Sequence, residues 1–223
     1  MNRFSWADPS VQTAFPIARP GYPMIFASAF ITAVFAILGF AAPAMVFMFI
    51  TLCVCLFFRD PDRVVPDIEN ALVSPADGRI IAVEEVDNTR FYDRKCLKVS
   101  IFMSVFNVHV NRIPYSGTVT KALYYPGKFF RANLDKASRK NEHNAICLET
   151  EKGELICFVQ IAGLIARRII SKVQANDKVT RGQRFGLICF GSRVDLYLPV
   201  GTKLDISVGD KVKSGTSIVG YLR

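Results

Sequence analysis

The hydrophobic pattern of the chain changes near Pro66. No charged residue occurs from 23 to 58, whereas apolar and polar residues alternate with a period of two beyond Pro66. The uncharged run of 36 residues exceeds the roughly 20 that one membrane-spanning helix needs. Pro43 interrupts it, because proline cannot continue a hydrogen-bonded helix interior. The run therefore predicts two short helices, 24–40 and 44–58, that form a hairpin.

The flanks of this run predict its orientation. Basic residues stand on both sides of it, at Arg3, Arg19, Arg59 and Arg63. By the positive-inside rule, a hairpin with both ends in the cytoplasm fits them. A secretory signal peptide is the alternative, but the run is too long, starts too late and lacks a cleavage region of small residues. The predicted organisation is a cytoplasmic segment (1–22), a membrane-anchoring hairpin (23–58) and a catalytic domain (59–223).

The remainder of the chain reads as a series of β-strands. Segments rich in β-branched and aromatic residues, several bounded by Pro or Gly, are expected as strands: 71–86, 95–104, 108–114, 117–125, 144–150, 154–163 and 188–199. A hairpin turn is expected at 149–155 with Lys152 and Gly153 at its tip, and a short helix near 133–141. The pattern predicts a mainly β domain of sandwich or barrel type.

A faint internal repeat lies within this β region. Residues 176–188, NDKVTRGQRFGLI, resemble residues 209–222, GDKVKSGTSIVGYL. Each copy reads as a turn, a short strand, a glycine turn and another strand. Two copies are too few for a solenoid, so the repeat predicts two similar β-hairpins around a pseudo-symmetric core.

Charge and cysteine content narrow the class of protein. A net charge of +9 is typical of proteins that bind nucleic acid or an anionic membrane surface, and the uncharged run favours the membrane and not nucleic acid. The six cysteines include no Cys-x-x-Cys pair, and there are only two histidines. This pattern predicts reduced, buried thiols in a cytosol-facing protein, without a disulfide framework or a metal site.

A Gly-Ser pair, Gly191 and Ser192, interrupts the last long strand. Glycine inside a strand marks a bulge, a bend or a close approach, and an ordinary bulge is one reading of it. A chemical reading is that the Ser192 hydroxyl attacks the carbonyl carbon of Gly191 and turns the amide into an ester. Elimination and hydrolysis would then leave a pyruvoyl group at position 192. The chain would make its own cofactor.

Six segments decide between these readings by the order in which they occur. They are FFRDPDRVVP (57–66), VSPADGRI (73–80), FMSVFNVHVNRIP (102–114), YYPGKFFRANLDKAS (124–138), NEHNA (141–145) and FGSRVDLYLP (190–199). Together they resemble the short-form phosphatidylserine decarboxylase proenzymes, from about Phe57 to the C-terminus. The resemblance implies cleavage into a β chain (1–191) and an α chain (192–223).

The same resemblance implies a self-cleavage set of Asp77, His109 and Ser192. His109 would take the Ser192 proton as general base, and Asp77 would orient the imidazole and stabilise its cation. Each residue also has an ordinary reading: Asp77 as a turn residue before Gly78, and His109 as a strand histidine with a satisfied hydrogen bond. The surrounding match favours the catalytic reading.

The sequence departs from the family pattern at two positions. Longer members carry a second histidine three residues after the first, where this chain has Arg112. His109 would then serve both cleavage and decarboxylation, unless Arg112 or a water takes one role. Relatives carry arginine in place of His143, which is interpreted as a surface or loop residue without a catalytic role.

The resemblance also implies the substrate, phosphatidylserine. The basic flanks of the uncharged run predict that the catalytic domain lies on the cytoplasmic face of the inner membrane. The pyruvoyl ketone would form a Schiff base with the substrate amine and serve as electron sink for decarboxylation to phosphatidylethanolamine and CO2. Assembly of the chain into a homo-oligomer is compatible with the sequence. Candidate lipid contacts are Lys128, Phe129, Phe130, Arg131, Arg167 and Arg168. The alternative function is a membrane-anchored serine hydrolase or acyl transferase that uses an uncleaved Ser192–His109–Asp77 set.

Overall fold

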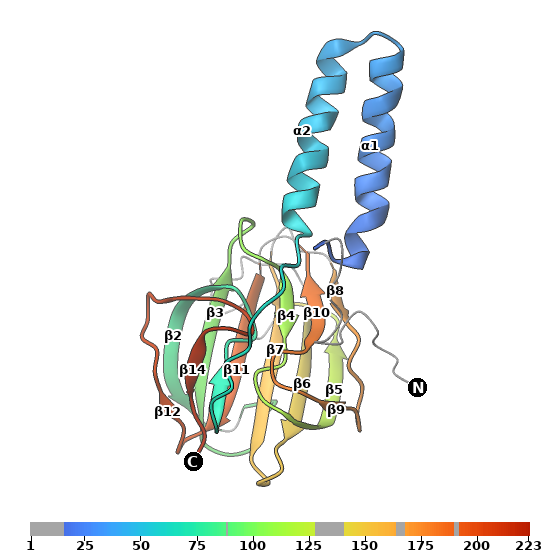
Figure 1. Ribbon diagram of the computed structural model, residues 1–223. Helices are drawn as coiled ribbons and strands as arrows, with labels where there is room; N and C mark the ends of the chain where they lie inside the picture. Colours follow the sequence, from blue (N-terminus) through green and yellow to red (C-terminus); the bar gives the residue numbers. More distant parts are fainter. Residues whose placement is uncertain (1–15, 88, 128–140, 164–167, 190–191) are drawn as a thin grey trace. The chain divides into compact units, whose positions relative to one another are not determined.

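A computed structural model of the chain describes residues 16–87, 89–127, 141–163, 168–189 and 192–223. Within them, residues 16–62 form one compact unit and residues 63–223 form another. The first unit is helical and the second is built from strands (Figure 1). The fold is therefore mainly β with a pair of N-terminal helices, as predicted.

The helical unit is a hairpin of two apolar helices. A single 3-10 turn, η1 (Arg19–Gly21), leads into α1 (Tyr22–Ile37), and α2 (Ala41–Phe57) returns beside it. The predicted bounds were wrong by one to three residues, because Pro43 does not break the run. Proline is tolerated in the first turn of a helix, and Pro43 lies there in α2. The reversal is made at Gly39, whose φ of +76° suits glycine.

The surfaces of these helices are apolar. Among the described residues, one helical stretch (Arg19–Ile37, mean hydropathy 1.6) is long and apolar enough to cross a membrane, and Ala41–Phe57 is a shorter apolar helix. Phe26 and Phe30 are each 70% exposed, and Ile37 is 85% exposed. Apolar surface exposed on this scale is typical of sites that contact a membrane or another protein.

The β unit contains one large antiparallel sheet. Its strands, in spatial order, are β13 (Lys211–Val212), β2 (Gly78–Val86), β3 (Cys96–Met103), β11 (Ser192–Pro199), β7 (Leu155–Ala162), β6 (His143–Glu149), β5 (Gly117–Tyr125) and β9 (Lys178–Val179). The turn predicted between β6 and β7 is confirmed, with Glu149 opposite Leu155 and Gly153 at a φ of +78°. The helix expected near 133–141 lies, apart from Asn141, outside the described residues.

Two three-stranded sheets complete the β unit. One has the order β1 (Ala71–Val73), β14 (Ile218–Tyr221), β12 (Lys203–Leu204), and the other β4 (Val110–Arg112), β10 (Arg184–Ile188), β8 (Ile169–Ser171). Residues from both share one hydrophobic core with the large sheet. Phe158 of β7, for example, packs against Phe185 of β10 with ring centroids 4.9 Å apart. We call the face of the large sheet toward this core the core face.

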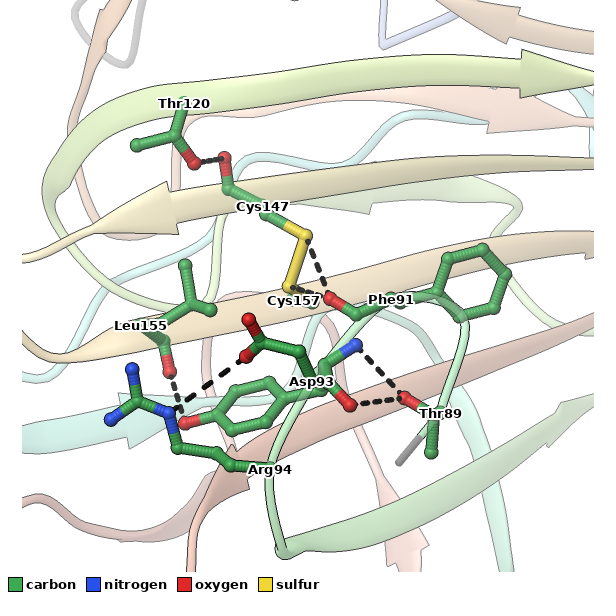
Figure 2. Close-up of a disulfide and its surroundings, with 9 residues drawn as sticks. Thr89, Phe91, Asp93, Arg94, Thr120, Cys147, Leu155 and Cys157 are labelled. Atoms are coloured by element: carbon green, nitrogen blue, oxygen red, sulfur yellow. Dashed lines mark hydrogen bonds and ion pairs between the residues drawn. A yellow bond between two sulfur atoms is a disulfide. The ribbon is translucent and has the colours of Figure 1, made fainter. Parts of the chain in front are cut away.

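The opposite face carries a smaller apolar cluster around a disulfide, and we call it the disulfide face. Cys147 of β6 and Cys157 of β7 are directly opposite in the ladder, with Cα atoms 4.0 Å apart, and their sulfurs are bonded (Figure 2). The carbonyl oxygen of Phe91 lies 3.2 Å from the Cys157 sulfur. The prediction of reduced thiols was wrong for this pair. Position in the ladder, which no Cys-x-x-Cys search tests, brings the two together.

The internal repeat is real but its predicted hairpins are not. Asn176 and Gly209 occupy matching positions with φ of +72° and +102°, as do Gly182 and Gly215 with +80° and +72°. The two strands of each copy pair with other strands, not with each other. The first strand of each copy, β9 or β13, forms an end of the large sheet, and the second, β10 or β14, is the middle strand of a small sheet. The repeat thus supplies both edge strands of the large sheet and the middle strand of each small sheet.

Candidate active site

Ser192 begins β11, near the middle of the large sheet. It lies opposite Met103 of β3 and Ala162 of β7, on the core face, and is fully buried. Its hydroxyl donates a hydrogen bond to the Met103 sulfur at 3.4 Å. A thioether is a weak acceptor, so the hydroxyl is held in an apolar setting by a weak bond. Gly191 lies outside the described residues.

His109 stands between a tight turn and β4, and its ring is oriented by the backbone. Its Nδ1 lies 2.9 Å from the carbonyl oxygen of Asn107. Because a carbonyl only accepts, Nδ1 carries the proton and the lone pair of a neutral ring is on Nε2. The turn is braced in its own right, since Asn107 Oδ1 accepts from the amide and the hydroxyl of Ser104, at 2.9 and 2.7 Å. This orienting carbonyl was missed by sequence reasoning, which looks for side chains.

The segments that carry His109 and Ser192 converge on Met103. Asn111, two residues after His109, donates from Nδ2 to the same Met103 sulfur at 3.7 Å. The amide of Ile188, just before the Gly-Ser pair, donates to the His109 carbonyl at 3.4 Å. Both histidine and serine are fully buried. Two regions far apart in sequence, 103–111 and 188–192, are thus brought to one place.

Asp77 lies just before β2, in a partly buried ionic contact. Its Oδ2 accepts from the Arg63 guanidinium at 2.9 Å, and its Oδ1 accepts from the Ser214 amide at 2.7 Å. Neither partner was predicted, because both lie far away in the sequence. A carboxylate has about four lone-pair positions, so each oxygen can still accept another bond.

Arg112 is part of the architecture of the fold. It is 4% exposed, and one of its terminal nitrogens donates to the Gly182 carbonyl at 3.1 Å. A Cβ at Gly215 would lie 2.7 Å from Cδ of Arg112. The side chain therefore packs between the matching glycines of the two repeat copies. These contacts give Arg112 a structural role at the point where relatives of the longer form carry a second histidine.

His143 is buried, which corrects its interpretation as a surface or loop residue. It begins β6 and is 2% exposed. Its ring stacks on Tyr125 at 4.8 Å, contacts Phe91 edge-on at 5.4 Å, and donates from Nδ1 to the Asn141 carbonyl at 2.6 Å. Burial lowers the pKa of His143, and the charge of Arg90 adds to this effect. The residue lies on the disulfide face, because it is opposite Ile161, and that row faces away from Ser192.

An ion pair directly after Ser192 was also missed. Arg193 and Asp195 alternate with core residues along β11, so their side chains point to the disulfide face. Nε and one terminal nitrogen of Arg193 each lie 2.8 Å from a carboxylate oxygen of Asp195. The pair is 2% and 0% exposed. Charged residues in alternation normally indicate a solvated face, which is why the strand pattern did not predict burial.

The predicted lipid contacts are only partly covered by the structure. Lys128, Phe129, Phe130, Arg131 and Arg167 lie outside the described residues. Arg168 is exposed, and its carbonyl accepts from the Cys189 amide at 3.1 Å. Burial raises the pKa of the Cys189 thiol, and the positive charge of Arg168 partly offsets this. A cation therefore stands beside the strand end that leads to the Gly-Ser pair.

The chain is similar to known proteins over nearly its whole length. A sequence model of the phosphatidylserine decarboxylase family matches residues 50–220. The chain belongs to the phosphatidylserine decarboxylase family. A phosphatidylserine decarboxylase proenzyme of Desulfotalea psychrophila is 50% identical over 212 residues, covering 95% of this chain and 99% of the relative. The proenzyme of Syntrophus aciditrophicus is 52% identical over 206 residues, covering 92% and 96%.

The match to the phosphatidylserine decarboxylase family confirms the resemblance drawn from the six segments. The matched range includes Asp77, His109 and the Gly-Ser pair. The chain is therefore an enzyme of the decarboxylase (carboxy-lyase) class. Both relatives are named as proenzymes, the term for an enzyme precursor.

Proposed function

We propose that the chain is a proenzyme that cuts itself between Gly191 and Ser192 and then decarboxylates phosphatidylserine to phosphatidylethanolamine. The observation that carries this proposal is the near-complete match to proenzymes of that name, at about half identity. The position of Ser192 supports it: the serine begins a central strand and is buried opposite Met103, the residue before the turn that leads to His109.

The cleavage needs only groups of the chain and one water. His109 Nε2 takes the hydroxyl proton of Ser192, and Oγ attacks the carbonyl carbon of Gly191. The C–O bond forms, the C–N bond breaks, and the nitrogen leaves as the free amine of residue 192. Loss of the Cα proton then breaks the Cβ–O bond and releases Gly191 as a carboxylate. The remaining enamine rearranges to an imine, and water replaces its nitrogen with oxygen and frees ammonia.

The surroundings of Ser192 fit the pyruvoyl group that results. The group is neutral, lacks the hydroxyl donor of serine and adds no atom to the side chain. A buried position between Met103 and Ala162, where the hydroxyl has a thioether as acceptor, suits such a group. Plain hydrolysis would instead leave an ammonium group there, at a desolvation cost of several kcal/mol. When formed, the pyruvoyl ketone supplies an electron sink for decarboxylation.

His109 and Asp77 have defined tasks in this scheme. The Asn107 carbonyl holds Nδ1–H, so Nε2 is the atom that accepts the Ser192 proton and later returns a proton to the substrate carbon. Asp77 is retained as the residue that stabilises the imidazolium, on the family resemblance and on its burial at 7% exposure. The guanidinium of Arg63 pairs with this carboxylate at 2.9 Å within the fold.

The apolar helices supply the membrane attachment in this proposal. Residues 23–58 anchor the chain in the inner membrane, with the β unit on the cytoplasmic face. The substrate then reaches the enzyme from the bilayer, where Phe129 and Phe130 dip into the headgroup region. Its phosphate is met by four cations: Lys128, Arg131, Arg167 and Arg168. Cations near the surface of an anionic membrane each contribute about 1 kcal/mol to binding. The net charge of +9 agrees with such a location.

The test is the covalent state of the purified protein. The wild type should give two chains, 1–191 and 192–223, with the second blocked to Edman degradation and reactive toward hydroxylamine. Ser192→Ala should stay as one chain without activity, because it lacks both the attacking oxygen and the leaving group. His109→Ala should cleave slowly or not at all, and His143→Ala is the control that cleaves normally. Full-length active protein with an intact serine would support the hydrolase reading and refute this one.

A further inference from the structure

A row of buried amide side chains crosses the core face and ends beside Ser192. Asn144 of β6 donates from Nδ2 to Gln160 of β7 at 3.1 Å. Gln160 donates from Nε2 to Asn111 of β4 at 2.9 Å, and Asn111 donates from Nδ2 to the Met103 sulfur at 3.7 Å. Exposure of the three amides is 6%, 0% and 0%. The cleavage scheme above uses none of them.

The sulfur at the end of this row fixes the direction of every bond in it. A thioether only accepts, so Asn111 must turn its NH2 group toward Met103 and its oxygen toward Gln160. Gln160 must then present NH2 to Asn111 and its oxygen to Asn144. All three donors therefore point along the row toward Met103, whose sulfur also accepts from Ser192, and bonds aligned in this way polarise one another.

The sulfur is a poor partner for the donors that meet there. It receives the Asn111 amide at 3.7 Å and the Ser192 hydroxyl at 3.4 Å. Buried amide groups normally pair with oxygen acceptors, and an exception of this kind calls for an explanation. In the uncut chain, two donors share one weak acceptor.

We propose that Asn111 is the hydrogen-bond donor for the ketone oxygen formed at residue 192. This inference rests on the proposed function, because it requires the cleavage. Conversion of Ser192 removes a donor and creates an oxygen that only accepts. The amide of Asn111, which shares the Met103 sulfur with Ser192 and is aimed by Gln160, then gains a strong acceptor in place of a weak one.

Such a bond has a use in the reaction. A donor on a carbonyl oxygen draws electrons from the carbonyl carbon and stabilises negative charge that develops on the oxygen when an amine adds. The donor is most effective when it is fixed before the reaction and shielded from water. Asn111 meets both conditions, because it is fully buried and its oxygen is held by Gln160.

The experiment compares processed wild type with Asn111→Leu, which keeps the side-chain volume and removes the donor. Intact mass first establishes that both proteins consist of two chains. The infrared band of the ketone, identified by isotope labelling of serine, should shift to higher wavenumber in Asn111→Leu. Oxime formation with hydroxylamine should slow, and kcat per pyruvoyl group should fall by about 10²-fold, the usual effect of losing one such donor. KM should change little. Ile146→Val, also on the core face, is the control for general loosening and should leave the band in place.

A second variant covers the case in which Asn111→Leu does not fold. Gln160→Met removes the group that aims Asn111 while keeping an unbranched side chain, and it should shift the band in the same direction by a smaller amount. The inference alone would be overturned by an unchanged ketone band and an unchanged kcat in processed Asn111→Leu. If only Gln160→Met folds, an unchanged band in that processed variant would overturn it. A wild-type protein that is uncut and shows no ketone band would overturn the proposed function, and this inference with it.

Discussion

Replacing Asp195 with asparagine should strongly destabilise the chain, because it removes the carboxylate charge that faces a buried guanidinium. The pair has two nitrogen–oxygen distances of 2.8 Å, one of them a hydrogen bond, and Arg193 and Asp195 are 2% and 0% exposed. Removing one partner of a pair buried this deeply costs roughly 3–5 kcal/mol. For a chain of this size, that corresponds to a fall in melting temperature of about 6–20 °C.

Two further variants separate the ion pair from other causes. The double variant Arg193→Met with Asp195→Leu removes both charges and should melt near the wild type or above it, because apolar replacements of similar volume spare the desolvation of two ions. Glu85→Gln breaks the contact of Glu85 with Lys95, whose side chains are 49% and 56% exposed, and should leave the melting temperature nearly unchanged.

The assay is thermal unfolding in detergent of the uncut Ser192→Ala background, so that cleavage does not alter the reference. Circular dichroism of the strands follows the transition. A fall of less than about 3 °C for Asp195→Asn would show that the buried charge is compensated elsewhere. A double variant that melts as low as the single one would show that packing at these positions, and not charge, sets the stability.

Three other outcomes can be checked with the same protein. The pKa of His143 is lowered in the folded chain, so the unfolded chain binds the proton first as pH falls below about 6.5. The free energy of unfolding of the wild type, measured with denaturant, should therefore fall through that range. In His143→Phe it should fall less. Replacing Cys147 and Cys157 by alanine should cost up to about 3 kcal/mol and abolish the effect of reductant on the unfolding midpoint; a midpoint that still responds to reductant would contradict the assignment. Deletion of residues 1–58 should release the enzyme from membranes at moderate salt and leave cleavage intact; loss of cleavage would place the domain boundary elsewhere.

The sequence predicted the elements better than their arrangement. Period-two alternation located most strands, and the Lys152–Gly153 tip correctly placed the β6–β7 hairpin. The order of the large sheet was out of reach, because β11 inserts between β3 and β7 through pairings that no local pattern encodes. The repeat could be read from the sequence because the residues of its turns are similar in both copies. The strands with which its own strands pair could not be predicted, because they lie elsewhere in the chain.

The missed site features share a physical cause. Cys147 and Cys157 could have been paired by extending the predicted ladder from Glu149 and Leu155 by two residues on each side. His143 could not have been placed, since its polar neighbours in NEHNA suggest exposure while the ring is covered by Phe91 from a distant loop. Burial by a remote segment is a tertiary property, and residue types alone do not report it.

The place of β11 also gives the proposed cut a consequence for the lifetime of the enzyme. After the cut, β11 through β14 belong to a separate chain, yet β11 remains bonded to β3 and β7 and β13 still closes the end of the large sheet. As one chain, these strands find their places by an intramolecular search. Once separated by unfolding, the fragment 192–223 is too short for a core of its own, and return requires the meeting of two molecules. An enzyme cut in this way would therefore fold only once, as its precursor, and its working life would be set by how slowly it unfolds.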